Sequence, residues 1–151
     1  MRGVYKYFVS LMTLAVVVQI GLAGFGAFDT ADKLSNSGST VDQDTFDNSF
    51  GPHAALGTFI VLSGLVLLLI SFGTRDGRRM KRAGIIFGLL VLQLILAWTG
   101  AAVPFVLGAL HPLNAFLILA VLGATTYREW KTVPAESPEI EAAPVPAPPA
   151  A

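Results

Sequence analysis

The chain contains two histidines, His53 and His111, and they occupy matching places in the sequence. Each lies near the start of a long apolar segment. Proline, which is favoured in the first turn of a helix, stands beside each as Pro52 and Pro112. Neutral imidazole is a good iron ligand, and two opposed histidines complete the coordination of a porphyrin iron. The residues therefore predict a bis-histidine site for b-type heme, with both histidines as metal ligands.

Small and polar residues near the histidines agree with this prediction. Gly57 and Ala115 lie one helical turn further on the same faces, where they would leave room for a flat ligand. Asn114 follows His111 by three residues and is placed to hydrogen-bond the imidazole or a heme propionate. We therefore expect the cofactor-binding residues to be His53, His111, Gly57 and Asn114.

Other interpretations of the histidines stay open. Histidines at helix ends also serve as interfacial residues that bond to loop backbone or lipid headgroups. Zinc or copper is less favoured, because only the aspartates of the first connection could supply further ligands at that depth. The chain has no cysteine, which excludes disulfides, thiolate ligands and cysteine nucleophiles.

The elements that would position the histidines are membrane-spanning helices. The chain of 151 residues is 54% hydrophobic and only 13% charged, whereas about a quarter of the residues are charged in an ordinary soluble domain. Four apolar runs have the roughly 20 residues that a bilayer requires, and backbone in lipid must satisfy its own hydrogen bonds as a helix. The spans are expected at about residues 5–28, 51–72, 83–103 and 107–127.

The sequence thus predicts an all-α fold, an integral membrane four-helix bundle formed by residues 1–131. The connection at Pro104–Gly108 is short, so the third and fourth helices should be antiparallel neighbours. The first connection, about residues 29–50, is rich in Ser, Thr, Asn and Asp and is expected to be a loop over the outer mouth of the bundle. Residues 132–151 are rich in Pro and Ala and are expected to form a disordered cytoplasmic tail.

Basic residues are sorted to one side of the predicted spans. Nine of the ten flank the first span, fill the second connection or follow the fourth span, and Lys33 alone lies in the acidic first connection. The positive-inside rule therefore predicts a multi-pass protein of the cell membrane with both termini in the cytoplasm and the histidines at the outer end. The alternative is that the first apolar run, preceded by Arg2 and Lys6, is a cleaved signal peptide, which would leave three spans.

A short signature recurs in the two halves of the chain. Residues 19–27 and 93–101 share Gln, Leu, Ala, Gly and Ala in register, and each signature precedes a segment with a histidine near its outer end. This predicts a pseudo-twofold repeat of two helical hairpins, although compositional coincidence stays open as the alternative. Gln19 and Gln93 are expected nearer the middle of the membrane than the histidines, where they would bond across the bundle.

The segments Val18–Phe28, Leu92–Ala97 and Leu110–Ala115 resemble those of a small bacterial four-helix membrane family of unknown function. The likeness covers nearly everything except the acidic connection and the tail. More distantly, the pattern is similar to one half of heme A synthase, whose two four-helix halves each use a histidine pair for heme. The resemblance implies that His53 and His111 are axial ligands. The synthase has a glutamate where Phe50 stands here, which leaves heme binding or electron transfer rather than heme modification.

These observations favour a membrane heme protein that performs single-heme redox exchange or heme handling near the outer face, with a membrane redox partner or quinol. Catalysis is less favoured, because the chain has no phosphate loop, nucleophile elbow or zincin motif. The basic segment 75–82 is expected to set topology and contact anionic lipid, not nucleic acid. The competing hypothesis is a cofactor-free accessory subunit that packs against a larger membrane complex through small residues such as Gly84 and Gly88.

Overall fold

The computed structural model describes residues 1–37 and 42–131, which are almost entirely helical. The elements are α1 (Arg2–Ser37), α2 (Gln43–Gly73), α3 (Gly77–Ala102), the short segment η1 (Pro104–Gly108) and α4 (Ala109–Lys131). The all-α prediction is confirmed. The prediction of a disordered tail at residues 132–151 lies outside the described residues.

All four long helices are long and apolar enough to cross a membrane. The candidate spans are Arg2–Asn36, Gln43–Gly73, Gly77–Gly100 and Val106–Lys131, with mean hydropathies between 1.9 and 2.5. At most 22% of the most apolar window of each span is buried inside the bundle. Most of the apolar surface therefore faces outward, as expected where the surrounding solvent is lipid. The chain has the properties of a multi-pass membrane protein.

The first connection is much shorter than the sequence predicts. α1 continues to Ser37 and α2 begins at Gln43, so the loop expected at residues 29–50 is mostly helical. Polar side chains support these extensions by bonds between residues four apart, such as Lys33 Nζ to Asp29 Oδ2 at 2.6 Å. The Asp42 carboxylate caps α2 by accepting from the Thr45 N–H at 2.8 Å. The loop prediction was wrong because polar composition alone does not exclude a helix with such pairs.

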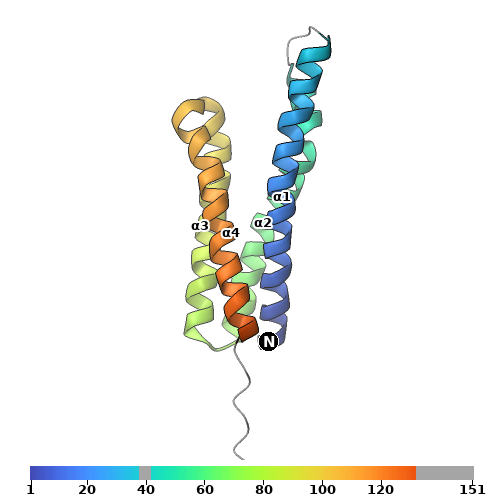
Figure 1. The fold of residues 1–151 in the computed structure, drawn as a ribbon. Helices are drawn as coiled ribbons and strands as arrows, with labels where there is room; N and C mark the ends of the chain where they lie inside the picture. The colour runs from blue at the N-terminus through green and yellow to red at the C-terminus, as the bar shows by residue number, and fades with distance from the viewer. Residues whose placement is uncertain (38–41, 132–151) are drawn as a thin grey trace, which may run out of the picture.

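The helices form two hairpins that lie side by side, α1 with α2 and α3 with α4 (Figure 1). Contacts of α1 with α4 and of α2 with α3 join the hairpins, whereas the described helices that lie on the diagonals do not touch through their backbones. α3 and α4 are antiparallel neighbours, as predicted. Their return is tight, because a Cβ at Gly100 would stand 3.1 Å from Gly108 Cα.

The two ends of the bundle differ in packing. We name the end that holds Arg2, the α2–α3 turn and Lys131 the basic end, and the opposite end the histidine end. Figure 1 shows that the hairpins lie closest at the basic end and diverge toward the histidine end. The divergence matches the distribution of buried side chains.

The apolar core lies in the basic half of the bundle. Its members are Tyr5, Val9, Met12, Val16, Ile60, Leu67, Ala83, Ile86, Leu90, Ile118 and Leu122. The spacing of four, three and four residues along α1 places its members on one helical face. Gly64 lets α2 approach α3, because a Cβ there would collide with Leu90. In the histidine half, only a few of the described residues are buried, and polar contacts take the place of an apolar core.

Candidate functional site

The structure brings the two histidines together. His53 is on α2 and His111 is on α4, which are diagonal helices, and their ring centroids are 6.3 Å apart with an angle of 64° between the planes. Two imidazoles that bind one metal ion from opposite sides, with metal–nitrogen bonds of about 2 Å, have centroids about 6 Å apart. The expected approach of one imidazole from each hairpin is therefore observed.

The histidines lie deeper along their helices than expected. α2 begins at Gln43, so His53 lies in its third turn and Pro52 is inside the helix instead of in its first turn. η1 adds a turn before α4, so His111 also lies farther from the histidine end of the bundle than the sequence predicts. The prediction that Gln19 and Gln93 lie below the histidines was therefore wrong. Each glutamine lies at the level of the histidine of its own hairpin and bonds to it.

His53 is held by two bonds to Gln19. The His53 Nδ1 atom lies 3.1 Å from the backbone oxygen of Gln19, and Gln19 Nε2 donates to the backbone oxygen of His53 at 2.7 Å. A carbonyl oxygen can only accept, so Nδ1 carries the proton. His53 Nε2 is left with a lone pair and no hydrogen bond among the described residues. An imidazole whose Nδ1–H donates to a backbone carbonyl is the usual form of a histidine ligand.

His111 is held by a chain of amides. Asn114 Nδ2 donates to the Leu89 carbonyl at 3.0 Å and to Gln93 Oε1 at 2.7 Å. Leu89 O can only accept, which fixes the Asn114 amide, and Asn114 in turn fixes Gln93 Oε1 as an acceptor. Gln93 Nε2 must then donate to His111 Nε2, 3.0 Å away. A neutral His111 therefore carries its proton on Nδ1, and that nitrogen is buried without a hydrogen-bond partner among the described residues.

The two imidazoles thus leave different atoms unbonded. His53 leaves a lone pair on Nε2, whereas His111 leaves an N–H on Nδ1. The separation of their ring centroids, 6.3 Å, is close to that of two imidazoles that share one metal ion. His53 Nε2 has an unshared lone pair as it stands, whereas the lone pair of His111 Nε2 accepts from the Gln93 amide.

Asn114 and Gly57 have specific places in this arrangement. Asn114, which the sequence placed near the imidazole, is buried and reaches His111 through Gln93. Gly57 faces Gln19, because a Cβ there would stand 2.8 Å from Gln19 Nε2. In this structure the Gln19 amide fills the space that the sequence prediction left for a flat ligand. The oxygen of the same amide, Gln19 Oε1, is buried without a hydrogen-bond partner among the described residues.

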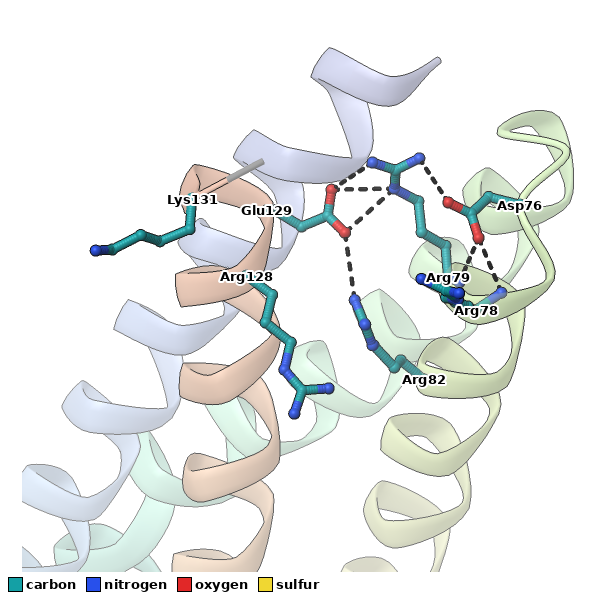
Figure 2. Close-up of a pocket in the computed structure, with 7 residues that line it drawn as sticks. All are labelled: Asp76, Arg78, Arg79, Arg82, Arg128, Glu129 and Lys131. Carbon is teal, nitrogen blue, oxygen red and sulfur yellow. Dashed lines mark hydrogen bonds and ion pairs between the residues drawn. The ribbon is translucent and has the colours of Figure 1, made fainter. Parts of the chain in front are cut away.

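Sequence reasoning missed a charged cluster at the basic end (Figure 2). The Glu129 side chain is 5% exposed and accepts from Arg79 Nε and Nη2 at 2.8–3.2 Å, while Arg82 Nη1 lies 3.6 Å from Oε1. Arg79 Nη1 also lies 3.0 Å from Asp76 Oδ2. These bonds fasten the start of α3 to the end of α4. The available signal was that Glu129 is the single acidic residue between residues 77 and 131, at a helix C-terminus where a carboxylate needs a partner.

Asp76 caps α3 within this cluster. Its carboxylate accepts from the backbone N–H groups of Arg78 and Arg79 at 2.9 and 3.4 Å. Burial acts to raise the pKa of Asp76, but these two hydrogen bonds and the charges of Arg79 and Arg78 lower it below its usual value. The carboxylate is therefore held in its charged form beside the arginines.

The fold defines the class, a four-helix membrane bundle with a histidine pair at one end. Comparison of the chain with models of protein families, with curated proteins and with solved structures gives no match. The similarity to heme A synthase stays a prediction. Across residues 1–37 and 42–131, no three His, Cys, Asp or Glu side chains gather in a group that could hold a metal ion.

Proposed function

We propose that this chain binds one b-type heme between His53 and His111. The observation that supports it is the 6.3 Å separation of the ring centroids of the two histidines, which come from diagonal helices. Within the described part of the chain the pair has no third protein ligand. A porphyrin would supply the further ligands that a metal ion between the two histidines needs. When bound, heme supplies one-electron redox chemistry.

The chain's own residues would hold the two imidazoles. His53 would bind through Nε2 while Gln19 O keeps its Nδ1–H oriented. His111 would bind through Nε2 after Gln93 releases it. Asn114 and Leu89 O would keep the remaining amides ordered.

The position of the pair supports a role at one membrane face. The chain has no other histidine, so it offers no equivalent pair for a second heme at the basic end. The sorting of basic residues supports a cytoplasmic basic end and an outer histidine end. The function we infer is single-heme redox exchange or heme handling at the outer face, with a membrane redox protein or quinol as partner.

A difference spectrum tests the proposal. Protein purified from heme-replete cells should show the reduced-minus-oxidised bands of a six-coordinate low-spin heme. His53→Ala and His111→Ala should each abolish the low-spin bands, because one lost ligand opens the iron. Thr58→Ala, an exposed change on α2, should leave the spectrum unchanged. Colourless wild-type protein, together with unchanged unfolding temperatures in both histidine variants, would refute heme binding.

A cofactor-free accessory subunit is the second candidate. Gly84 and Gly88 on α3 are exposed, and a Cβ at either would meet nothing within 4 Å. They therefore do not serve packing inside this bundle, and small residues four apart permit close approach of a partner helix. This hypothesis requires a stoichiometric partner after purification in mild detergent and its loss in Gly84→Leu. Heme-loaded protein that purifies without a partner would contradict it.

A further inference from the structure

Gln93 occupies the lone pair that His111 would offer to a metal ion. Gln93 Nε2 donates to His111 Nε2 at 3.0 Å, and an imidazole nitrogen has only one lone pair to share. The other ring nitrogen of the neutral imidazole, Nδ1, carries the proton and is buried. A metal ion therefore binds neither nitrogen of His111 until the Gln93 amide turns or moves away.

Asn114 keeps the Gln93 amide in this orientation. Asn114 Nδ2 donates to Gln93 Oε1 at 2.7 Å and to the Leu89 backbone oxygen at 3.0 Å. Asn114 is buried, and hydrogen bonds of buried groups are costly to leave unmade. If the Gln93 amide turned over, its NH₂ group would face Asn114 Nδ2, which is also a donor, and that bond would be lost. The orientation in which Gln93 donates to His111 is therefore the favoured one.

His53 has no such competitor. Its Nδ1–H is bonded to the Gln19 backbone oxygen at 3.1 Å, and the Gln19 side chain bonds the backbone oxygen of His53 instead of its ring. The lone pair of His53 Nε2 is therefore unshared. The two hairpins thus supply one histidine that is ready to bind a metal ion and one that must first be released.

Competition by Gln93 lowers the apparent affinity of the histidine pair. A ligand that needs a minor state binds more weakly in proportion to the population of that state. His111 keeps its Nδ1 proton on release, so its Nε2 only exchanges a hydrogen bond for a metal bond. A fixed electron carrier gains nothing from such competition, whereas a protein that passes heme on needs a stable heme-free form. We infer, on the basis of the proposed heme site, that Gln93 competes with iron for His111 and that this chain receives heme and passes it on.

A hemin titration of the whole protein in detergent tests this competition. Gln93→Leu removes the competing donor, so it should bind hemin about fivefold more tightly than the wild-type protein, the factor that corresponds to one net hydrogen bond. It should also pass hemin to added apomyoglobin about fivefold more slowly. Thr99→Val is the control on the same helix, because the exposed Thr99 hydroxyl bonds only to Ile95 O in its own helix. Its hemin affinity and transfer rate should equal those of the wild-type protein.

A measurement on heme-free protein separates the competition from a merely structural role of Gln93. In protein labelled with nitrogen-15 histidine, Gln93→Leu should release His111 from its single tautomer, while His53 keeps its proton on Nδ1. If Gln93→Leu does not fold, Asn114→Leu replaces it in the titration. That variant frees the Gln93 amide to turn, so it should also raise the hemin affinity.

The outcomes separate this inference from the proposed function. Hemin affinity that is equal in the wild-type protein and in Gln93→Leu would overturn the competition and leave the heme site standing. Wild-type protein that retains its hemin in the presence of excess apomyoglobin would overturn the role in heme transfer. No hemin binding by the wild-type protein or by any variant would refute the heme site and this inference together.

Discussion

The two ends of the bundle are held together by different forces. At the basic end, apolar side chains from all four helices form a core, and Glu129 with Arg79 fastens α3 to α4. At the histidine end, Gln19, Gln93 and Asn114 make the contacts of the histidine pair through amide hydrogen bonds. The comparison indicates that stability is concentrated at the basic end, while the histidine end keeps polar groups that can exchange partners.

The two hairpins differ in the same way at the histidine end. In α1–α2 the glutamine bonds the backbone of its histidine, whereas in α3–α4 the glutamine bonds the imidazole itself. The difference arises three residues after each histidine, where α4 has Asn114 and α2 has Leu56. Asn114 holds the Gln93 amide toward the ring, and leucine cannot do so. A repeated Gln–His pair therefore has two chemical states in one molecule.

Loss of the Glu129 charge should have the largest effect and would test whether the basic end carries the stability. Glu129→Gln leaves Arg79 buried with only Asp76 as an anionic partner, so we expect a loss of about 3 kcal/mol of unfolding free energy. Denaturant unfolding in detergent measures the loss. Asp47→Asn, which removes an exposed carboxylate, should cost less than about 1 kcal/mol. Equal losses in the two variants would contradict a dominant role for the buried pair.

A smaller effect is expected from the apolar core. Leu67 is fully buried on α2. Leu67→Ala should therefore cost about 2 to 3 kcal/mol, since it removes contacts and leaves a cavity. Leu110→Ala, at a half-exposed position near the histidine end, should cost less than about 1 kcal/mol. Similar losses at the two positions would break the contrast between the ends.

Much of the fold could be predicted from the sequence, but the contacts that distinguish the two ends could not. The lengths of the four apolar runs predicted four helices, and the matching places of His53 and His111 predicted their approach. The pairing of Arg79 with Glu129 joins residues that are 50 positions apart and depends on how α3 and α4 are rotated against each other. The depth of each histidine depends on where its helix begins. Because residues 43–50 are mostly polar, the sequence predicted a loop where α2 in fact begins.

Gly57→Ala would sharpen the role of the amide contacts. A methyl group at position 57 would displace Gln19 Nε2 and break its bond to His53 O. The loss of that bond, about 1 kcal/mol, should offset the gain of up to about 1 kcal/mol that alanine brings to a helix. Gly21→Ala meets nothing within 4 Å and should show the gain alone. If both variants are stabilised equally, the Gln19 contact contributes nothing.

The sharpest test of the difference between hairpins is expected from Asn114→Leu, which is read from one imidazole and not from stability. Leucine stands three residues after His53, so this substitution gives α4 the arrangement of α2. Without Asn114, the Gln93 amide is free to turn, and His111 loses the donor that keeps its proton on Nδ1. Nitrogen-15 spectra of heme-free protein with labelled histidine report the tautomer of each ring. The wild-type protein should show both rings protonated at Nδ1, and Asn114→Leu should give a mixture for His111 while His53 is unchanged. A His111 tautomer that does not respond would show that the ring is oriented by its surroundings alone and that the amide chain from Leu89 has no part in it.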